Sequence, residues 1–296
     1  MPLAATCALP LEEPVSDSTG LLSLYSLEMT AKDIPQLGEV AARIPAGTRI
    51  SVTFLPGESE AARVDAVAAA HGFGFTPVPH LSARRLQSAA ELEGYLARIR
   101  ERAPVDHAFV IAGDLPRPSG PFDDALAIIR SGLLEKHGIR HVGISGYPQG
   151  HPDIPDDRLW AAMRDKVAAL AERDLEASIV TQFGFDAAPI LDWTARVRAN
   201  GIAAPIWAGV PGPANVRTLL RFASRCGVEA STRVMAKYGL SLTRLLSTAG
   251  PDRLVEEIAA GLAPGLHGDV RLHFYPFGGF GNTIRWIDDA GRASRP

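Results

Sequence analysis

Two acidic residues in this sequence lie directly after mostly apolar runs. Glu28 follows residues 24–27, and Asp114 follows Gly113 at the end of the run at residues 107–112. Desolvation favours the protonated form of a carboxyl group, so Glu28 is a candidate general acid. An ion pair at a strand end explains Glu28 equally well, and a turn or helix cap explains Asp114 equally well.

Further polar and aromatic side chains at comparable positions are candidates for ligand binding. His80 and Gln182 each end a short apolar run, and Tyr147 and His151 lie in the proline-containing segment at residues 146–152. An amide presents a donor and an acceptor to one edge of a heterocycle, and an aromatic ring stacks on a flat ligand. A hydrogen bond across the rim is the more common role for a lone histidine, and a structural loop is the alternative for residues 146–152.

Composition and charge narrow the class of protein. Hydrophobic residues make up 46% of the 296, which is typical of a folded globular chain with a sizeable core. The net charge of -3 argues against broad attraction to nucleic acid or anionic lipid. Cys7 and Cys226 have no partner at metal-ligand spacing, so neither a metal site nor a disulfide framework is expected. No signal peptide or membrane span is expected either, and we predict a cytoplasmic protein.

The candidate residues are positioned by short apolar segments that alternate with helical periodicity, a pattern typical of βαβ units. Eight strands are expected at residues 22–28, 49–54, 75–80, 107–112, 141–145, 177–182, 206–210 and 270–275. Helices are expected at residues 32–43, 58–71, 89–102, 122–137, 156–173, 187–200 and 214–225, with a helical insertion at about 230–262.

Eight β/α units are the number that closes a barrel, so we predict an α/β fold of the (β/α)₈ TIM barrel type. An open doubly wound sheet is the competing architecture. A single barrel domain is expected over residues 21–296, after an irregular N-terminal arm at residues 1–20. Barrel enzymes place their active sites at the C-terminal ends of the strands, which is where the candidate residues fall. The glycine-rich segment at residues 277–282 is expected to be a loop near the barrel mouth.

This ordered set of residues resembles the catalytic barrel of the methylenetetrahydrofolate reductase family. The resemblance runs from about residue 25 to residue 275. The matching segments are residues 27–28, 51–53, 79–81, 113–116, 147–148, 151–152, 181–183, 185–186 and 273–275.

The resemblance implies a flavoprotein oxidoreductase of one-carbon metabolism and methionine biosynthesis. In that family FAD takes a hydride from NADH or NADPH and passes it to methylenetetrahydrofolate, giving methyltetrahydrofolate. Glu28 would protonate the folate nitrogen, Asp114 would bind the pterin and influence the flavin, and Gln182 would hold the folate. The positions that match FAD contacts are Thr53, His80, Gly113, Tyr147, His151 and Lys166.

The chain departs from the family at several expected FAD contacts. Ala112 stands where an arginine is common, and Ala162 and Asp165 replace residues that are more often amide and basic. Losing cationic partners for a pyrophosphate weakens FAD binding, so the cofactor is either held differently or not used. Two alternatives follow: a tetrahydrofolate-dependent methyltransferase, or a folate-binding barrel subunit without catalytic activity.

Assembly is a separate expectation. Trp193 and Trp207 are large apolar residues that would suit an interface, and the resemblance favours a homo-oligomer. Packing between the helices and the barrel accounts for both tryptophans equally well.

Overall fold

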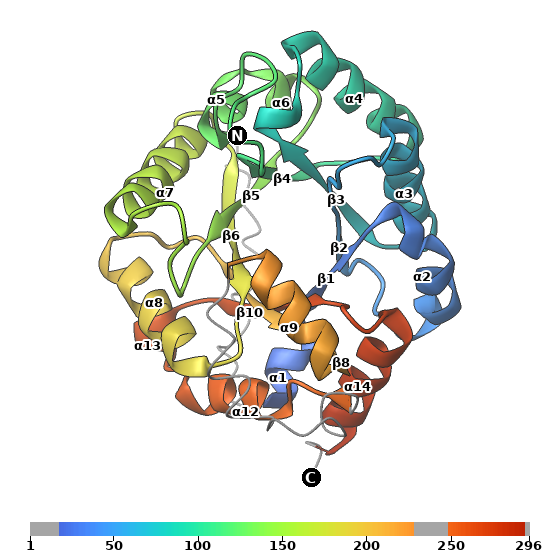
Figure 1. Ribbon diagram of the computed structural model, residues 1–296, viewed down its shortest axis with the longest axis vertical. Coiled ribbons are helices and arrows are strands. Elements are labelled where there is room, and N and C mark those ends of the chain that lie inside the picture. Colours follow the sequence, from blue (N-terminus) through green and yellow to red (C-terminus); the bar gives the residue numbers. More distant parts are fainter. Residues whose placement is uncertain (1–17, 228–247, 294–296) are drawn as a thin grey trace, which may run out of the picture.

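The computed structural model describes residues 18–227 and 248–293, and its central feature is a closed barrel of parallel strands (Figure 1). The strands pair in the order β1-β10-β7-β6-β5-β4-β3-β2. They are β1 (Tyr25–Met29), β2 (Arg49–Val52), β3 (Thr76–Ser82), β4 (His107–Ile111), β5 (His141–Gly146), β6 (Glu176–Phe183), β7 (Ile206–Pro211) and β10 (Val270–Tyr275). The predicted (β/α)₈ barrel is confirmed, and the open sheet is excluded because β1 pairs with both β2 and β10.

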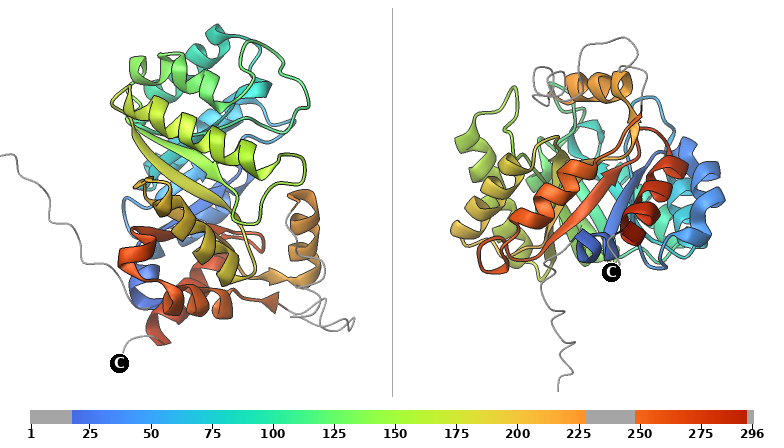
Figure 2. Two further views of the ribbon diagram at one scale, coloured as in Figure 1. Left: turned by 90° about the vertical axis from the view of Figure 1, so that its left-hand side faces the viewer. Right: turned by 90° about the horizontal axis from the view of Figure 1, so that it is seen from below.

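Helices surround the barrel in Figure 1. They include α2 (Ile34–Val40), α3 (Glu60–Gly72), α4 (Ala89–Arg102), α5 (Ala125–Arg130), α6 (Leu133–Lys136), α7 (Asp156–Ala171), α8 (Ala187–Ala199), α12 (Asp252–Gly261) and α14 (Phe280–Ala293). Figure 2 shows α9 (Val216–Arg225) set apart from this ring, on the side to which the strands point. Among the helices of the described segments, none combines the length and apolar character needed to cross a membrane.

Some element boundaries differ from those expected. Residues 22–23 belong to α1 (Ser18–Ser23) rather than to the first strand, and α1 takes in the end of the segment expected to be irregular. The helix expected at residues 122–137 is two helices, because Gly132 between α5 and α6 has a φ of 77°. Residues 214–215 form β8 (Ala214–Asn215), which pairs with β9 (Thr248–Ala249), so α9 begins later than expected.

The last helix of the barrel, α14, was not predicted from the sequence. It begins at Phe280, inside the segment that was expected to be a loop. Phe280, Ile284 and Ile287 are buried, and their spacing of four and three residues forms a helical stripe that outweighs the glycines beside it. Of the helical insertion expected at about 230–262, α12 lies within the described part, and residues 228–247 lie outside it.

Strand residues alternate between two environments. Leu27, Ile50, Ile144 and Leu272 belong to the main core, which lies between the barrel and its helices. Their neighbours along the strands face the barrel interior, where a cavity is lined by residues of seven strands, among them Ser26, Ser51, Ser178, Arg49 and His107. Barrel interiors are usually filled with branched apolar side chains, so the serine, arginine and histidine side chains that share this interior with apolar ones are unusual.

Trp193 and Trp207 are both buried, so the structure supports the packing explanation of these residues. The Trp193 ring lies 6.0 Å from that of Trp160, and the guanidinium groups of Arg49 and Arg271 lie 5.0 and 5.3 Å from the ring centre of Trp207. Neither tryptophan is available to an interface, and oligomerisation stays a prediction.

Candidate active site

Glu28 lies in β1 near its C-terminal end, at the mouth of the barrel, between two histidines. Its Oε2 atom is 3.9 Å from Nε2 of His273 and 4.0 Å from Nε2 of His80. The side chain of Glu28 is 23% exposed, whereas both histidines are buried. The carboxylate therefore keeps an opening toward ligand while its protein partners are shielded from water.

His80 is electrically neutral at physiological pH. Burial lowers the pKa of its imidazole to about 4, against the opposing attraction of Glu28 and with a smaller contribution from His273. Its ring also packs at 4.7 Å from that of Phe109. A neutral imidazole forms no ion pair with the carboxyl group beside it.

His273 is held in place by its neighbours on both sides. Its Nδ1 atom is 2.8 Å from Oγ of Ser26 on the adjacent strand, and its ring meets that of Tyr275 edge-on at 4.8 Å. The Tyr275 hydroxyl donates to the carbonyl oxygen of Thr181 at 3.0 Å, and burial raises the pKa of this phenol. No role was predicted from the sequence for Ser26, His273 or Tyr275. Their polar character at alternate positions of two strands was the available signal.

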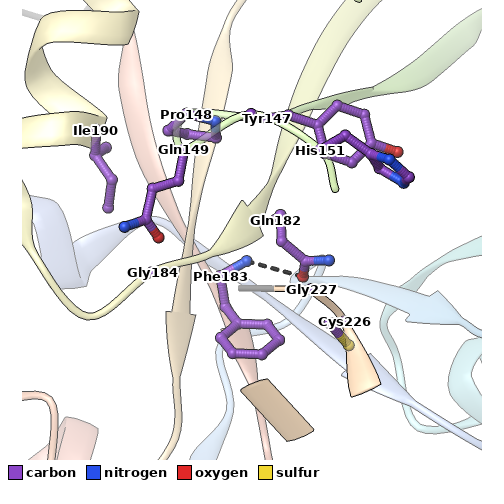
Figure 3. Close-up of a pocket in the computed structure, with 11 residues that line it drawn as sticks. Tyr147, Pro148, Gln149, His151, Gln182, Phe183, Gly184, Ile190, Cys226 and Gly227 are labelled. Atoms are coloured by element: carbon purple, nitrogen blue, oxygen red, sulfur yellow. Dashed lines mark hydrogen bonds between the residues drawn. The ribbon is translucent and has the colours of Figure 1, made fainter. Parts of the chain in front are cut away.

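Gln182 lines a small pocket at the same end of the barrel as Glu28. Figure 3 shows its amide between the loop that carries Tyr147 and His151 and the end of α9 at Cys226. The Gln182 Oε1 atom accepts from the backbone N–H of Phe183 at 3.1 Å. The Tyr147 and His151 rings meet edge-on at 5.3 Å. The pocket has about 10 Å³ open to the centres of water molecules, which is room for one water molecule at most.

Asp114 is engaged by a partner that was not predicted from the sequence. Arg85 holds its carboxylate with two hydrogen bonds, Nε to Oδ1 and Nη2 to Oδ2, each of 2.8 Å. The Asp114 side chain is 66% exposed, and within the described residues it makes no hydrogen bond to Glu28 or Gln182. Arg85 lies in the 3-10 turn Ala83–Arg85 that follows β3, and it reaches the carboxylate of Asp114 in the loop that follows β4.

The backbone conformation at position 113 requires glycine. Its φ is 90°, and a Cβ atom there would lie 2.2 Å from Oγ of Ser82. Both facts exclude a side chain at this position without any ligand being considered.

The other expected FAD contacts offer few free donors. The buried hydroxyl of Thr53 donates to the Met29 carbonyl at 3.1 Å, and Nδ1 of His151 accepts from the backbone of Asp153. Lys166 is buried, and this lowers its pKa to about 8 despite the attraction of Asp124. Asp165 beside it is exposed and adds a negative charge. These residues fit a diphosphate group poorly.

The sequence of this chain is similar to that of one protein family over most of its length. A family model described as Methylenetetrahydrofolate reductase matches residues 24–277. Methylenetetrahydrofolate reductase 2 of Saccharomyces cerevisiae is 28% identical over 126 residues, which cover 39% of this chain and 20% of the yeast protein. The alignment thus spans only a fifth of that relative's length.

A solved structure shares the fold over nearly the whole chain. It is an uncharacterized protein from Clostridium thermocellum, described as binding two copies of 5-methyl-5,6,7,8-tetrahydrofolic acid. Its TM-score is 0.62 at 10% identity, and the match covers 91% of this chain and 95% of that one. At this identity the similarity establishes the barrel fold alone.

Proposed function

The chain belongs to the methylenetetrahydrofolate reductase family, and from this premise we propose that it interconverts 5,10-methylenetetrahydrofolate and 5-methyltetrahydrofolate by hydride transfer. One observation supports this most directly. Glu28 is a partly exposed carboxyl group at the barrel mouth whose neighbours are two buried histidines, one of them neutral. The Clostridium thermocellum protein of the same fold is described as binding 5-methyl-5,6,7,8-tetrahydrofolic acid, which is consistent with a folate ligand for this barrel.

In the proposed reaction Glu28 donates its proton to the folate nitrogen, which opens the five-membered ring to a reactive iminium. The N–H bond forms as the O–H bond of Glu28 breaks, and the carbon is then electrophilic enough to accept a hydride. Phe183 engages Oε1 of Gln182, and among the described residues the amide N–H₂ group has no partner, so it has donors for the edge of the pterin. NADH or NADPH is the proposed hydride source, and FAD as the carrier between them stays a prediction from the resemblance.

An assay of the purified protein in both directions tests the proposal. We expect oxidation of 5-methyltetrahydrofolate with an electron acceptor, and consumption of NADH or NADPH with 5,10-methylenetetrahydrofolate. Absorbance at the flavin bands of the same sample shows whether FAD accompanies the activity. Absence of both turnover and folate binding would refute the proposal. Folate binding with methyl transfer, or with no chemistry at all, would favour the methyltransferase or the non-catalytic subunit.

A further inference from the structure

The barrel interior contains a cavity below Glu28 that is lined by both polar and apolar side chains. Its lining includes the hydroxyl-bearing residues Ser26, Ser51 and Ser178, and it has about 20 Å³ open to the centres of water molecules. One ordered water needs about 10 to 15 Å³ of such space. The cavity therefore has room for water, and its hydroxyl groups provide the polar partners that a buried water requires.

Several polar atoms around this cavity have no hydrogen-bond partner among residues 18–227 and 248–293. Nε1 of Trp207 and Nε2 of His107 are buried without a hydrogen bond, and both residues line the cavity. Within the described part of the chain, the side-chain oxygens of Ser51 and Ser178 also make no hydrogen bond to another protein group. Buried polar groups are costly unless they are hydrogen-bonded, and water satisfies them at little cost.

The upper end of the cavity is connected to Glu28 through two side chains. Ser26 lines the cavity and hydrogen-bonds Nδ1 of His273 at 2.8 Å, and Nε2 of His273 is 3.9 Å from Oε2 of Glu28. The two ring nitrogens of His273 therefore face opposite ends of the same path. A small side-chain rotation or one water closes the gap to Glu28.

The lower end of the cavity reaches the floor of the barrel, where β4 and β5 begin. His107 and His141 line it there. Nδ1 of His107 lies 2.6 Å from Oδ1 of Asp106, and Nδ1 of His141 lies 3.0 Å from Oε2 of Glu176. The two carboxylate side chains are 54% and 77% exposed. Each histidine thus links the cavity to a carboxylate that is in contact with solvent.

These floor residues do not suit a shared metal ion, although ligand atoms of Asp106, His107 and His141 lie within 4.8 Å of one another. The two imidazole rings are stacked, with centroids 4.2 Å apart and an interplanar angle of 18°. An ion bound by both would have to lie in the plane of each ring, and stacked rings do not share a plane. A hydrogen-bonded path for protons is the better explanation of the cluster.

We propose that Glu28 exchanges its proton with solvent through the barrel floor, by way of His273, Ser26 and water in the interior cavity. This inference rests on the proposed function, because it requires that Glu28 protonate a folate. A folate seated at the mouth covers the direct route from solvent to Glu28. The floor route stays open during the reaction.

The relay conserves protons and moves no electrons. After Glu28 has given its proton to the folate nitrogen, the carboxylate accepts one from Nε2 of His273. Nδ1 of His273 accepts the proton of the Ser26 hydroxyl, and Ser26 accepts one from cavity water. Solvent at the floor replaces that proton, so the net change is one proton transferred from solvent to the folate. Oxidation of 5-methyltetrahydrofolate runs the same steps in reverse.

A high-resolution crystal structure tests the path independently of any activity. We expect ordered water bridging the side-chain oxygens of Ser26, Ser51 and Ser178. A dry cavity would overturn the relay and would leave the proposed function untouched.

Kinetics of Ser26→Ala in mixtures of H₂O and D₂O test the role of the path. We expect folate turnover to fall about tenfold, less than for loss of the general acid itself. The dependence of rate on deuterium fraction should change from curved, with several protons in motion, to linear. Ser26→Thr keeps the hydroxyl and should restore most of the rate and the curvature. Ser23→Ala is the matched control, since it removes the same hydroxyl from an exposed residue of α1, outside the cavity, and should behave like the wild type.

The outcomes separate the two proposals. A wild-type protein without folate turnover refutes the proposed function and removes the relay with it. An active wild type whose Ser26→Ala variant has an unchanged rate overturns the relay alone. The relay is also overturned if Ser26→Ala is slow but keeps the wild-type deuterium dependence, because the effect is then one of structure.

Discussion

At the scale of single residues, the proposed chemistry depends most on Glu28. Glu28→Gln keeps the size of the side chain and cannot deliver a proton at neutral pH, so folate turnover should fall by about 100-fold to 10,000-fold. Steady-state rates with 5-methyltetrahydrofolate measure the loss. Glu39→Gln makes the same chemical change on the exposed surface of α2 and should leave the rate unchanged. Unchanged turnover in Glu28→Gln would show that the general acid lies elsewhere.

Asp114 poses a second question at the same scale, because its carboxylate is already paired with Arg85. If Asp114 also binds the pterin, Asp114→Asn should weaken folate binding about tenfold or more, the loss expected for a hydrogen bond to a charged group. Calorimetric titration with 5-methyltetrahydrofolate measures the affinity. Arg85→Gln breaks the same ion pair and keeps the carboxylate, so it should bind folate more tightly than Asp114→Asn does. Equal affinities in the two variants would assign Asp114 a structural role only.

At the scale of elements, two glycines in the loops after β2 and β4 allow backbone strain to be distinguished from a steric clash. Gly57 and Gly113 both have positive φ, of 78° and 90°, but a Cβ at Gly57 meets no atom within 4 Å, whereas one at Gly113 meets Ser82. Gly57→Ala should therefore cost about 1 kcal/mol of the free energy of unfolding, from backbone strain alone. Gly113→Ala should cost about 2 to 4 kcal/mol, because a steric clash is added. Urea denaturation of both variants checks this, and equal losses would contradict the clash.

At the scale of the whole molecule, buried histidines make stability depend on pH. The pKa of His80 is lowered to about 4 in the folded protein, and that of an unfolded histidine is about 6.5. The unfolded state therefore binds more protons between these values. Stability contributed by neutral His80 is present above pH 6.5 and lost as pH falls toward 4, by about 3 kcal/mol in total.

Burial also lowers the pKa of His107 to about 4. His107 therefore also makes the folded protein less stable as the pH falls. Chemical denaturation at pH 7.0 and pH 4.5, repeated on His80→Gln, measures the contribution of His80. The variant should lose less stability over this interval than the wild type. An equal loss in both proteins would show that other groups govern the pH dependence.

Local sequence patterns determined the barrel and the position of Glu28 within it. Alternation of apolar and polar residues and helical spacing are properties of neighbouring residues, so all eight strands could be located before their pairing was known. The helix α14 was not predicted, because the glycines at its start obscured the helical spacing of its apolar residues.

The contacts around Glu28 were decided by tertiary structure. Ser26 and His273 are 247 residues apart and hydrogen-bond only because the barrel closes β10 onto β1. The pairing of Arg85 with Asp114 likewise depends on how the loops after β3 and β4 fold over one another. Which polar residues share the interior cavity depends on strand register. A shift of one residue would turn each side chain to the opposite face, and no local pattern specifies the register of strands that are distant in sequence.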